Sequence, residues 1–223
     1  PTELARVINE TAQAGGNIII PSFAVERTQE LLYHLNALRQ EGRIPPLVTF
    51  VDSPMAIRVT KVFRHHQELF DDEARDYMSR GANPVDFAGL SFSMGVNDSK
   101  AINLIKGVSI IIAGAGMCTG GRIKHHLFNN IARPECTVLF VGYQAVGTLG
   151  RHILERPESI RLFGKELPLR ARVEKISGFS GHADRDELIR WITSLKKAPR
   201  KVFVTHGEEE AAESFGALLH EKT

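Results

Sequence analysis

Two histidines near the end of the sequence are the residues best suited to metal or acid–base chemistry. His182 lies in the segment SGFSGHAD and His206 in VFVTHGE, each at the predicted turn between a β-rich run and a helix. An acid follows each of them, Asp184 and Glu208. If the two preceding strands are adjacent and parallel, both rings face one cleft. The two histidines form either a metal or acid–base site or a pair of ordinary turn residues, and we weight these two interpretations equally.

A glycine-rich turn provides the second candidate, a site for an anion. In IIIAGAGMCTGGR a fully apolar run enters four glycines and then a helix that carries Arg122. Glycines let a backbone approach an anion closely, and the start of a helix offers unpaired N–H groups. No Gly-Lys-Ser/Thr follows, so the segment is not a Walker loop, and it is not a clean GxGxxG. Phosphate binding and a plain tight turn both stay open.

Two further motifs follow predicted strands. In VTFVDSPMA, Asp52 and Ser53 precede a proline at the first turn of a helix, and helix capping is favoured over catalysis. In FVGYQAVGTLGR an aromatic, an amide and an arginine stand among glycines. That set suits either nucleotide contact or a structural loop.

The elements that position these motifs alternate along the chain. Apolar runs typical of strands lie at 17–20, 47–51, 108–113, 136–142, 172–176 and 201–205, between helical patterns at 3–14, 24–40, 54–66, 71–79, 121–131, 184–196 and 208–220. This alternation predicts an α/β fold, a Rossmann-like and mostly parallel sheet with helices on both faces. The functional loops are expected at the carboxyl ends of the strands.

The pattern is indistinct in two places and changes in a third. Neither a helical nor a strand pattern is clear over 81–98, and the alternation of helix and strand patterns is weaker over 144–170. A domain break is expected near residue 170, because 156–170 is rich in charge and proline and a βαβα pattern restarts afterwards. On the helices, the adjacent pairs His65-His66 and His125-His126 each diverge by about 100° and are interpreted as surface residues.

Composition restricts the class of protein. The 223 residues are 43% hydrophobic and 24% charged, which excludes disordered, collagen-like and coiled-coil chains as a description of the whole. A formal charge of +2 does not by itself argue for nucleic-acid binding. Two cysteines, Cys118 and Cys136, cannot form a disulfide scaffold and fit a reducing compartment. No leader and no run of about 18 apolar residues is found, so we expect a cytoplasmic protein with no membrane association.

Six motifs together resemble a known family. PSFAVERTQELL, VDSPMA, GMCTGGR, VGYQAVGTLGR, FSGHAD and THGE, in this order and spacing, resemble the β-CASP ribonucleases of the metallo-β-lactamase superfamily. The nearest branch is that of the bacterial and archaeal relatives of the cleavage-and-polyadenylation endonuclease. The resemblance extends nearly end to end. It implies a β-CASP cap in residues 1–170 and the C-terminal return segment of a metallo-β-lactamase domain in residues 171–223.

The resemblance also implies an activity, hydrolysis of RNA phosphodiester bonds by an enzyme with two zinc ions. The RNA is expected to be single-stranded and to run between the cap and the metal domain. By correspondence His182 acts near the scissile phosphate, His206 binds zinc and Ser180 touches phosphate. The implied contacts with the RNA backbone are Gly116, Thr119, Gly120, Gly121 and Arg122. Gly114 and Ala115 stand where the family commonly has serines, so no hydroxyl contact is expected there.

One family signature is absent. No His-x-His occurs in the sequence, so the HxHxDH motif and most zinc ligands are expected to precede residue 1. We therefore expect a fragment that lacks the N-terminal metallo-β-lactamase part as its partner and is inactive and metal-free alone. A homodimer is left open. The alternatives are a non-catalytic RNA-binding scaffold of the same fold and, more distantly, a generic Rossmann-like nucleotide binder.

Overall fold

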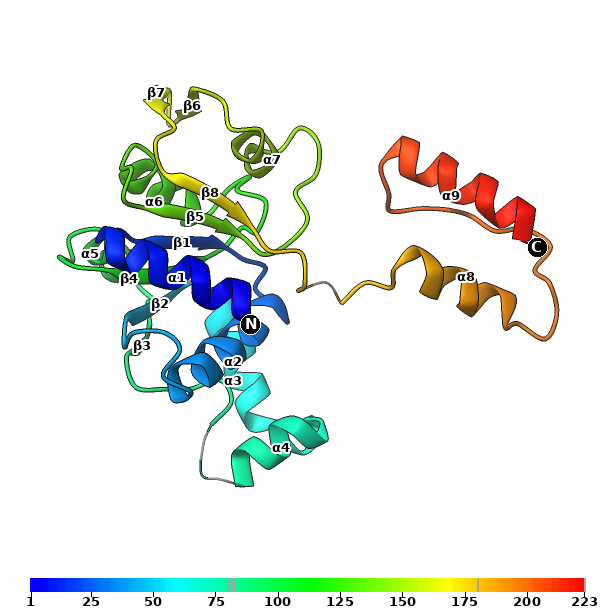
Figure 1. The fold of residues 1–223 in the computed structure, drawn as a ribbon, viewed down its shortest axis with the longest axis horizontal. Helices are drawn as coiled ribbons and strands as arrows, with labels where there is room; N and C mark the ends of the chain where they lie inside the picture. The colour runs from blue at the N-terminus through cyan, green and yellow to red at the C-terminus, as the bar shows by residue number, and fades with distance from the viewer. Residues whose placement is uncertain (80, 82, 180, 223) are drawn as a thin grey trace. The chain divides into compact units, whose positions relative to one another are not determined.

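The chain forms two compact units. The computed structural model describes residues 1–79, 81, 83–179 and 181–222. The first unit comprises Pro1–Phe179 and the second Ser180–Thr223 (Figure 1).

The first unit is built around a parallel sheet. In the described residues six strands pair side by side in the order β3 (Leu90–Phe92), β2 (Val48–Asp52), β4 (Ser109–Ala113), β1 (Ile18–Pro21), β5 (Thr137–Phe140) and β8 (Arg172–Lys175). Every one of these pairings is parallel. The predicted mostly parallel sheet is confirmed.

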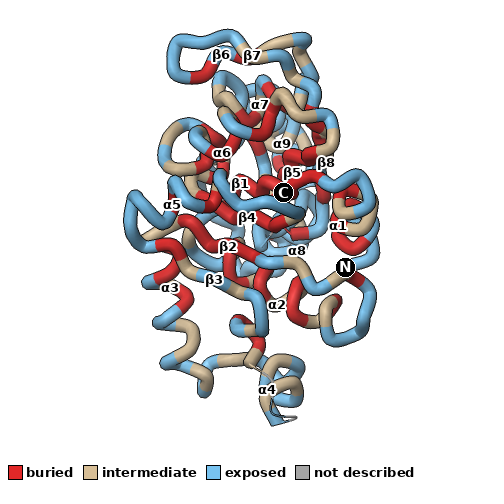
Figure 2. Tube along the Cα trace, turned by 90° about the vertical axis from the view of Figure 1, so that its left-hand side faces the viewer, coloured by how far each residue is buried: buried red, intermediate tan, exposed pale blue. Residues whose placement is uncertain are grey.

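Helices cover both faces of this sheet because its central strands are apolar on both sides. Ile18 and Ile20 pack into one core cluster, whereas Ile19 between them packs into another. The first cluster includes residues of α1 (Thr2–Ala14), α2 (Arg27–Gln40) and α3 (Pro54–His65). The opposite face is covered by α5 (Val96–Ile102), α6 (Ile123–Asn130) and α7 (Leu149–Leu154). Full burial of each isoleucine contributes about 1.5–3 kcal/mol, and Figure 2 shows the strands as the buried centre of this unit.

The order of the strands places a topological switch point at the carboxyl ends of β1 and β4. From β1 the chain passes through α2, on one face, to reach β2. From the adjacent β4 it passes through α6, on the other face, to reach β5. Neighbouring strands whose connections leave to opposite faces open a gap between their loops, which is where open α/β sheets bind ligands.

The two indistinct stretches contain short elements that the sequence pattern did not reveal. The stretch 81–98 contains β3 and the start of α5. The stretch 144–170 contains α7 and an antiparallel hairpin of β6 (Ser159–Leu162) and β7 (Lys165–Pro168). At the other end of the first unit, the exposed α4 (Asp72–Ser79) follows a 3-10 turn at Gln67–Leu69 (Figures 1 and 2).

The first unit extends past residue 170, near which the sequence placed a break. The last strand, β8, pairs with β5 in the register Thr137↔Arg172. Phe179 belongs to the same apolar core and meets the ring of His34 on α2 edge-on, with 5.4 Å between centroids. These contacts hold 171–179 in the first unit.

The second unit contains two helices, α8 (Arg185–Thr193) and α9 (Glu209–Lys222). The prediction of a strand over 201–205 is wrong for the described chain, which has no strand there. A strand is defined by hydrogen bonds to a neighbour, and within 181–222 there is no other strand with which this segment could pair. No helix in the described part of the chain has the length and apolarity that crossing a membrane requires.

Candidate functional site

A buried carboxylate organises the carboxyl edge of the sheet. The side chain of Asp52, at the end of β2, is fully buried. Its Oδ1 accepts a hydrogen bond from Nη1 of Arg122 at 2.6 Å, and its Oδ2 lies 2.7 Å from Nε2 of His126. The Ser99 hydroxyl of α5 also donates to Oδ2. One carboxylate therefore joins β2 to α5 and to the start of α6.

These partners keep the buried group charged. Burial raises the pKa of the Asp52 carboxyl, but hydrogen bonds from His126, Ser99 and Arg122 favour the ionised form more strongly. The net result lowers its pKa from 3.8 to about 2. Asp52 is an anion at every physiological pH, and its contacts make it a structural anchor.

The guanidinium of Arg122 joins a further segment to this anchor. Its Nη1 donates to the carbonyl oxygen of Ser93 at 3.0 Å, and its Nη2 to that of Met94 at 2.8 Å. Arg122 follows the glycine-rich turn directly, so the ion pair fixes the end of the turn against β2 and the β3–α5 loop. The expectation that Arg122 contacts RNA stays a prediction, because its described contacts are with the protein itself.

His126 corrects the sequence interpretation. The pair His125-His126 was predicted to lie at the surface, and His125 does, but His126 is fully buried. Its Nδ1 lies 3.1 Å from Oδ1 of Asn103, and its Nε2 faces Asp52. A helix turns about 100° per residue, so the second histidine of the pair points into the core.

The capping role expected at VDSPMA belongs to Ser53, whose hydroxyl accepts the N–H of Ala56 at 3.3 Å.

The glycine-rich turn is closed by its own backbone. The N–H of Ile123 donates to Gly114 O at 3.1 Å, and that of Ala115 to Gly120 O at 3.3 Å. Gly121 has φ +74°, and a Cβ there would lie 2.5 Å from Gly114 O. Only glycine fits at this position, because it has no Cβ to clash with Gly114 O and it is not strained at positive φ. The turn is a rigid loop that brings 119–121 to the outside.

Gln144 supports the same turn from the β5 side. Its buried amide nitrogen donates to Gly116 O at 3.0 Å and to Gly142 O at 3.3 Å. The N–H of Gly150 donates to Met117 O at 3.1 Å. In FVGYQAVGTLGR, then, the amide is structural. Arg151 pairs with Glu155 along α7, and the exposed Tyr143 remains at the surface.

An aromatic ring lies beside two glycines that follow β4 and β5. A Cβ on Gly116 would lie 2.9 Å from the ring of Phe23, and one on Gly142 would lie 3.8 Å from it. The Phe23 side chain nevertheless stays 43% exposed. Gly116, predicted to contact RNA, is buried beneath this ring, whereas Thr119 and Gly121 are exposed and Gly120 is half-buried.

Three consecutive N–H groups of the turn face no protein acceptor. Among the described residues, no hydrogen bond engages the N–H of Thr119, Gly120 or Gly121. A left-handed residue that follows a right-handed or extended one turns neighbouring N–H groups toward one point, a concavity that binds anions. The turn has left-handed residues at Cys118, with φ +59°, and at Gly121, with φ +74°, so these N–H groups are candidates for contact with an anion.

The second unit brings its two predicted histidines together. The ring centroids of His182 and His206 are 6.3 Å apart, with the planes at 40°, and both side chains are exposed. They do not lie at two neighbouring strand ends, because 201–205 forms no strand. His206 instead occupies a turn with φ +65°. Ser180 lies outside the described residues.

The acids that follow these histidines do not complete a metal site. Asp184 caps α8, its carboxylate accepting the N–H of Glu187 at 2.8 Å while Glu187 accepts that of Asp184 at 3.0 Å. Within the described chain no three His, Cys, Asp or Glu side chains lie close enough together to hold a metal ion. Zinc sites use three or four protein ligands, so two imidazoles alone do not complete one.

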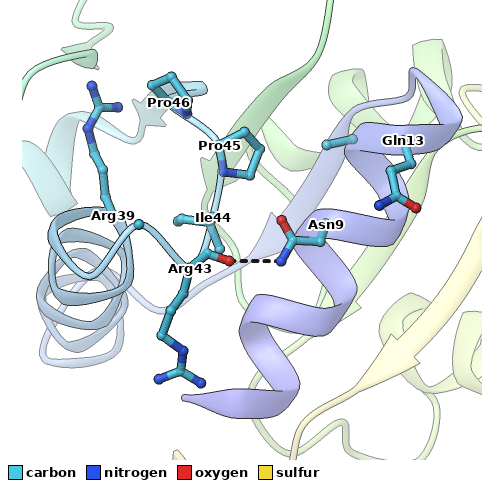
Figure 3. A pocket seen from close by; sticks show the side chains of 9 residues that line it. Asn9, Gln13, Arg39, Arg43, Ile44, Pro45 and Pro46 are labelled. Atoms are coloured by element: carbon cyan, nitrogen blue, oxygen red, sulfur yellow. Dashed lines mark hydrogen bonds between the residues drawn. The ribbon is translucent and has the colours of Figure 1, made fainter.

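A pocket at the opposite edge of the sheet contains none of the predicted residues. It lies between α1 and the loop after α2 (Figure 3), lined by Asn9, Ala12, Gln13, Arg39, Gly42, Arg43, Ile44, Pro45 and Pro46. Figure 3 shows the amide of Asn9 bonded to the carbonyl of Arg43, at 2.8 Å. The guanidinium of Arg43 bonds Glu41, and that of Arg39 lies 5.9 Å from the ring of Phe87. Both cations are already engaged, so we place the candidate site at the carboxyl edge.

The Asp52 anchor predicts acid sensitivity. A carboxylate with a lowered folded-state pKa stabilises the fold fully above its unfolded pKa, and the stabilisation is lost as pH falls from about 4 to about 2. The loss is about 2 kcal/mol. Asp52→Asn should remove this pH dependence and cost about 3–5 kcal/mol at neutral pH, because the partly buried Arg122 would lose its counterion and the buried His126 would lose its carboxylate partner. Urea unfolding between pH 6 and pH 2 measures both effects. Asp72→Asn on exposed α4 is the control and should shift stability by less than about 0.5 kcal/mol; equal effects of the two substitutions would contradict the anchor.

Two neighbouring glycines of the turn should respond differently to alanine. Gly121→Ala combines a positive φ with a 2.5 Å clash against backbone and should lower the free energy of unfolding by more than about 1 kcal/mol. Gly120→Ala meets no atom within 4 Å and should leave stability within about 1 kcal/mol of the parent. Thermal unfolding of the two variants tests the difference, and equal melting temperatures would show that the turn is not rigid.

Comparison with known proteins places the chain in a family. The profile of the Beta-Casp domain matches residues 28–153, and that of the Zn-dependent metallo-hydrolase RNA specificity domain matches residues 166–223. Ribonuclease TTHA0252 of Thermus thermophilus is 42% identical over 217 residues, which cover 97% of this chain and 49% of that protein. An RNase J-like protein of Methanocaldococcus jannaschii is 31% identical, with 97% and 49% covered. Transcription termination factor FttA of Methanosarcina mazei is 30% identical, with 98% and 35% covered.

The chain thus spans about half the length of the first two relatives and about a third of the third. The residues matched by the first profile include the glycine-rich turn, and those matched by the second include both histidines. The chain belongs to the β-CASP family of the metallo-β-lactamase superfamily.

Proposed function

We propose that this chain supplies the RNA-binding and phosphate-gripping part of a zinc-dependent ribonuclease that hydrolyses RNA phosphodiester bonds. The observation that carries the proposal is the turn at 119–121 at the carboxyl edge of the sheet, whose three N–H groups donate no hydrogen bond within the described chain. The names of its relatives support it, since two are ribonucleases or resemble one. We further infer that the RNA is single-stranded.

The domain assignment follows the two matched profiles. We assign residues 1–170 to the β-CASP cap and 171–223 to the return segment of the metallo-β-lactamase domain. The second profile begins at residue 166, which supports a boundary ahead of β8 even though the compact unit continues to Phe179. On this assignment β8 is a strand of the return segment that pairs with the sheet of the cap.

The turn would hold a phosphate through its main chain. Backbone N–H groups make charge-assisted hydrogen bonds to an anion without reading base identity. Phe23 stands over Gly116 beside it and offers an exposed ring to a base. We assign Gly120, Gly121 and Thr119 to phosphate contact, with Arg122 and the buried Gly116 positioning the turn.

The two histidines would supply the chemistry. We assign His206 as a zinc ligand and His182 as the group that stabilises charge on the scissile phosphate or protonates the leaving oxygen, with Ser180 as a further phosphate contact. The facing of the two rings at 6.3 Å supports a shared role. Zinc, inferred to be two ions, would activate water and polarise the phosphoryl group. Because the described chain offers two imidazoles, further ligands must come from residues outside it, and the chain alone should not cleave RNA.

The compartment and the partner follow from the same proposal. Both cysteines are buried free thiols, and burial raises the pKa of Cys118 to about 12, so it packs as an apolar side chain. Free thiols support a reducing, cytoplasmic location. The segment that carries the remaining metal ligands is the partner that we infer for this chain.

The turn is tested by adding one methyl group. Gly120→Ala should weaken binding of a single-stranded RNA 12-mer about 10-fold, because a side chain would keep the phosphate away from the N–H groups. Thermal stability should not fall. Gly216→Ala on α9, which also meets no atom within 4 Å, is the matched control and should bind like the parent. Fluorescence anisotropy measures the affinities, and unchanged binding by Gly120→Ala would remove the turn from the RNA site.

The histidines are tested in the intact protein. His206→Ala should lower its zinc content and abolish cleavage, because a ligand is lost. His182→Ala should retain zinc and lower the cleavage rate about 10²–10⁴-fold, the range for a lost general acid. His220→Ala, on exposed α9, is the control and should change neither. Elemental analysis and a cleavage assay separate the roles, and an intact protein that binds RNA and zinc without cutting would be a scaffold instead.

A further inference from the structure

The tip of the β6–β7 hairpin has an unexpected residue in its turn. Two residues, Phe163 and Gly164, join the strands, and the pair Leu162↔Lys165 closes the loop. Both loop residues have positive φ, +49° and +78°, which defines a type I′ turn. Such turns favour Asn-Gly, and a bulky side chain at positive φ is uncommon. A phenylalanine there is unfavourable for the turn itself, so its use must come from what the ring contacts.

The ring of Phe163 stacks on the start of α6. It lies 4.6 Å from the His125 ring, with the planes at 25°, and 5.9 Å from the ring of Phe128. The side chain is nevertheless 51% exposed. Phe163 is held in position on one side and open to solvent on the other.

Two lysines flank this aromatic stack. The ammonium of Lys124 lies 5.4 Å from the centre of the Phe163 ring, and that of Lys165 lies 5.7 Å from the centre of Phe128. Neither forms an ion pair with a carboxylate anywhere in the described chain. The acid nearest in the hairpin, Glu166, accepts the hydroxyl of Ser159. Lys124, His125, Phe128, Phe163 and Lys165 therefore form a cationic aromatic surface, called here the hairpin-tip cluster.

We propose that the hairpin-tip cluster binds single-stranded RNA, stacking one unpaired base on Phe163 and holding the flanking phosphates with Lys124 and Lys165. Aromatic platforms flanked by cations are how proteins bind single strands without reading sequence. The uncompensated positive charge favours a polyanion over a protein partner. The inference rests on the proposed function for the identity of the ligand, but it adds a second contact that no residue of the glycine-rich turn supplies.

The cluster is well placed to act together with the turn. Helix α6 begins at Ile123, immediately after that turn, so Lys124 and His125 lie at the same edge of the sheet. Figures 1 and 2 show the hairpin on the side of the sheet that carries α6 and α7. A strand whose phosphate rests on 119–121 can continue toward Phe163 along the first turn of α6.

The turn chemistry allows a substitution that separates binding from folding. Phe163→Asn creates the Asn-Gly pair that a type I′ turn prefers, so the melting temperature should stay equal or rise. It removes the stacking ring, and affinity for a fluorescein-labelled U12 oligonucleotide should fall about 5- to 20-fold, as measured by anisotropy with the 223-residue chain. Phe163→Trp should retain or increase affinity. Phe163→Asn that binds U12 like the parent would overturn the inference and leave the surface to a protein partner.

The lysines are tested by the salt dependence of binding. Lys124→Gln combined with Lys165→Gln should reduce the slope of log affinity against log salt by about 1.4, because each single-strand phosphate contact contributes about 0.7. Lys61→Gln with Lys106→Gln, both exposed, is the charge-matched control and should leave the slope unchanged. Equal slopes in the two double variants would overturn the phosphate contacts. If Gly120→Ala weakens binding but Phe163→Asn does not, this inference fails alone; if the parent chain does not bind U12, the proposed function fails with it.

Discussion

The buried charge of Asp52 is the interaction on which the architecture of the carboxyl edge depends. An ion out of water is tolerated only when hydrogen bonds and an opposite charge replace its hydration. Arg122 and His126 at the start of α6 and Ser99 on α5 provide them. The requirement to satisfy one carboxylate thereby fixes where the turn ends, how α6 starts and where α5 packs. An apolar contact would hold these segments together but would leave their orientation free.

At the carboxyl edge of the sheet, some residues support the glycine-rich turn from within the protein and others lie at the surface. Arg122, Gln144 and the buried Gly116 face inward and carry hydrogen bonds or close contacts within the protein. The N–H groups of 119–121 donate no hydrogen bond within the described chain. A backbone site of this kind recognises the charge and shape of a phosphate and is indifferent to base identity. Phe23 and the hairpin-tip cluster add aromatic surface, which in our proposal contributes affinity for a single strand with little sequence preference.

The residues proposed for RNA binding and cleavage belong to both units. The glycine-rich turn belongs to the first, and the imidazoles of His182 and His206 belong to the second. Two imidazoles fall short of a zinc coordination set. The chain matches relatives about two or three times its own length. The second matched family is named for both a zinc-dependent hydrolase and RNA specificity. These facts are the basis of the proposal that this chain grips the substrate while residues outside it complete the metal centre.

Sequence alone determined the parallel sheet, its covered faces and the family, because apolar runs such as Ile18–Ile20 and Ile110–Ile112 can be buried only between two layers of helices, and because six motifs recur in a fixed order. It also singled out His182 and His206, whose rings do face each other. Only the tertiary structure decided that His126 is buried on Asp52, that Gln144 is structural and that 201–205 forms no strand. The first two depend on hydrogen-bond partners 28 or more residues away, and the third depends on the lack of a neighbouring strand. Local periodicity carries no information about such pairings, which arise only when distant segments pack together.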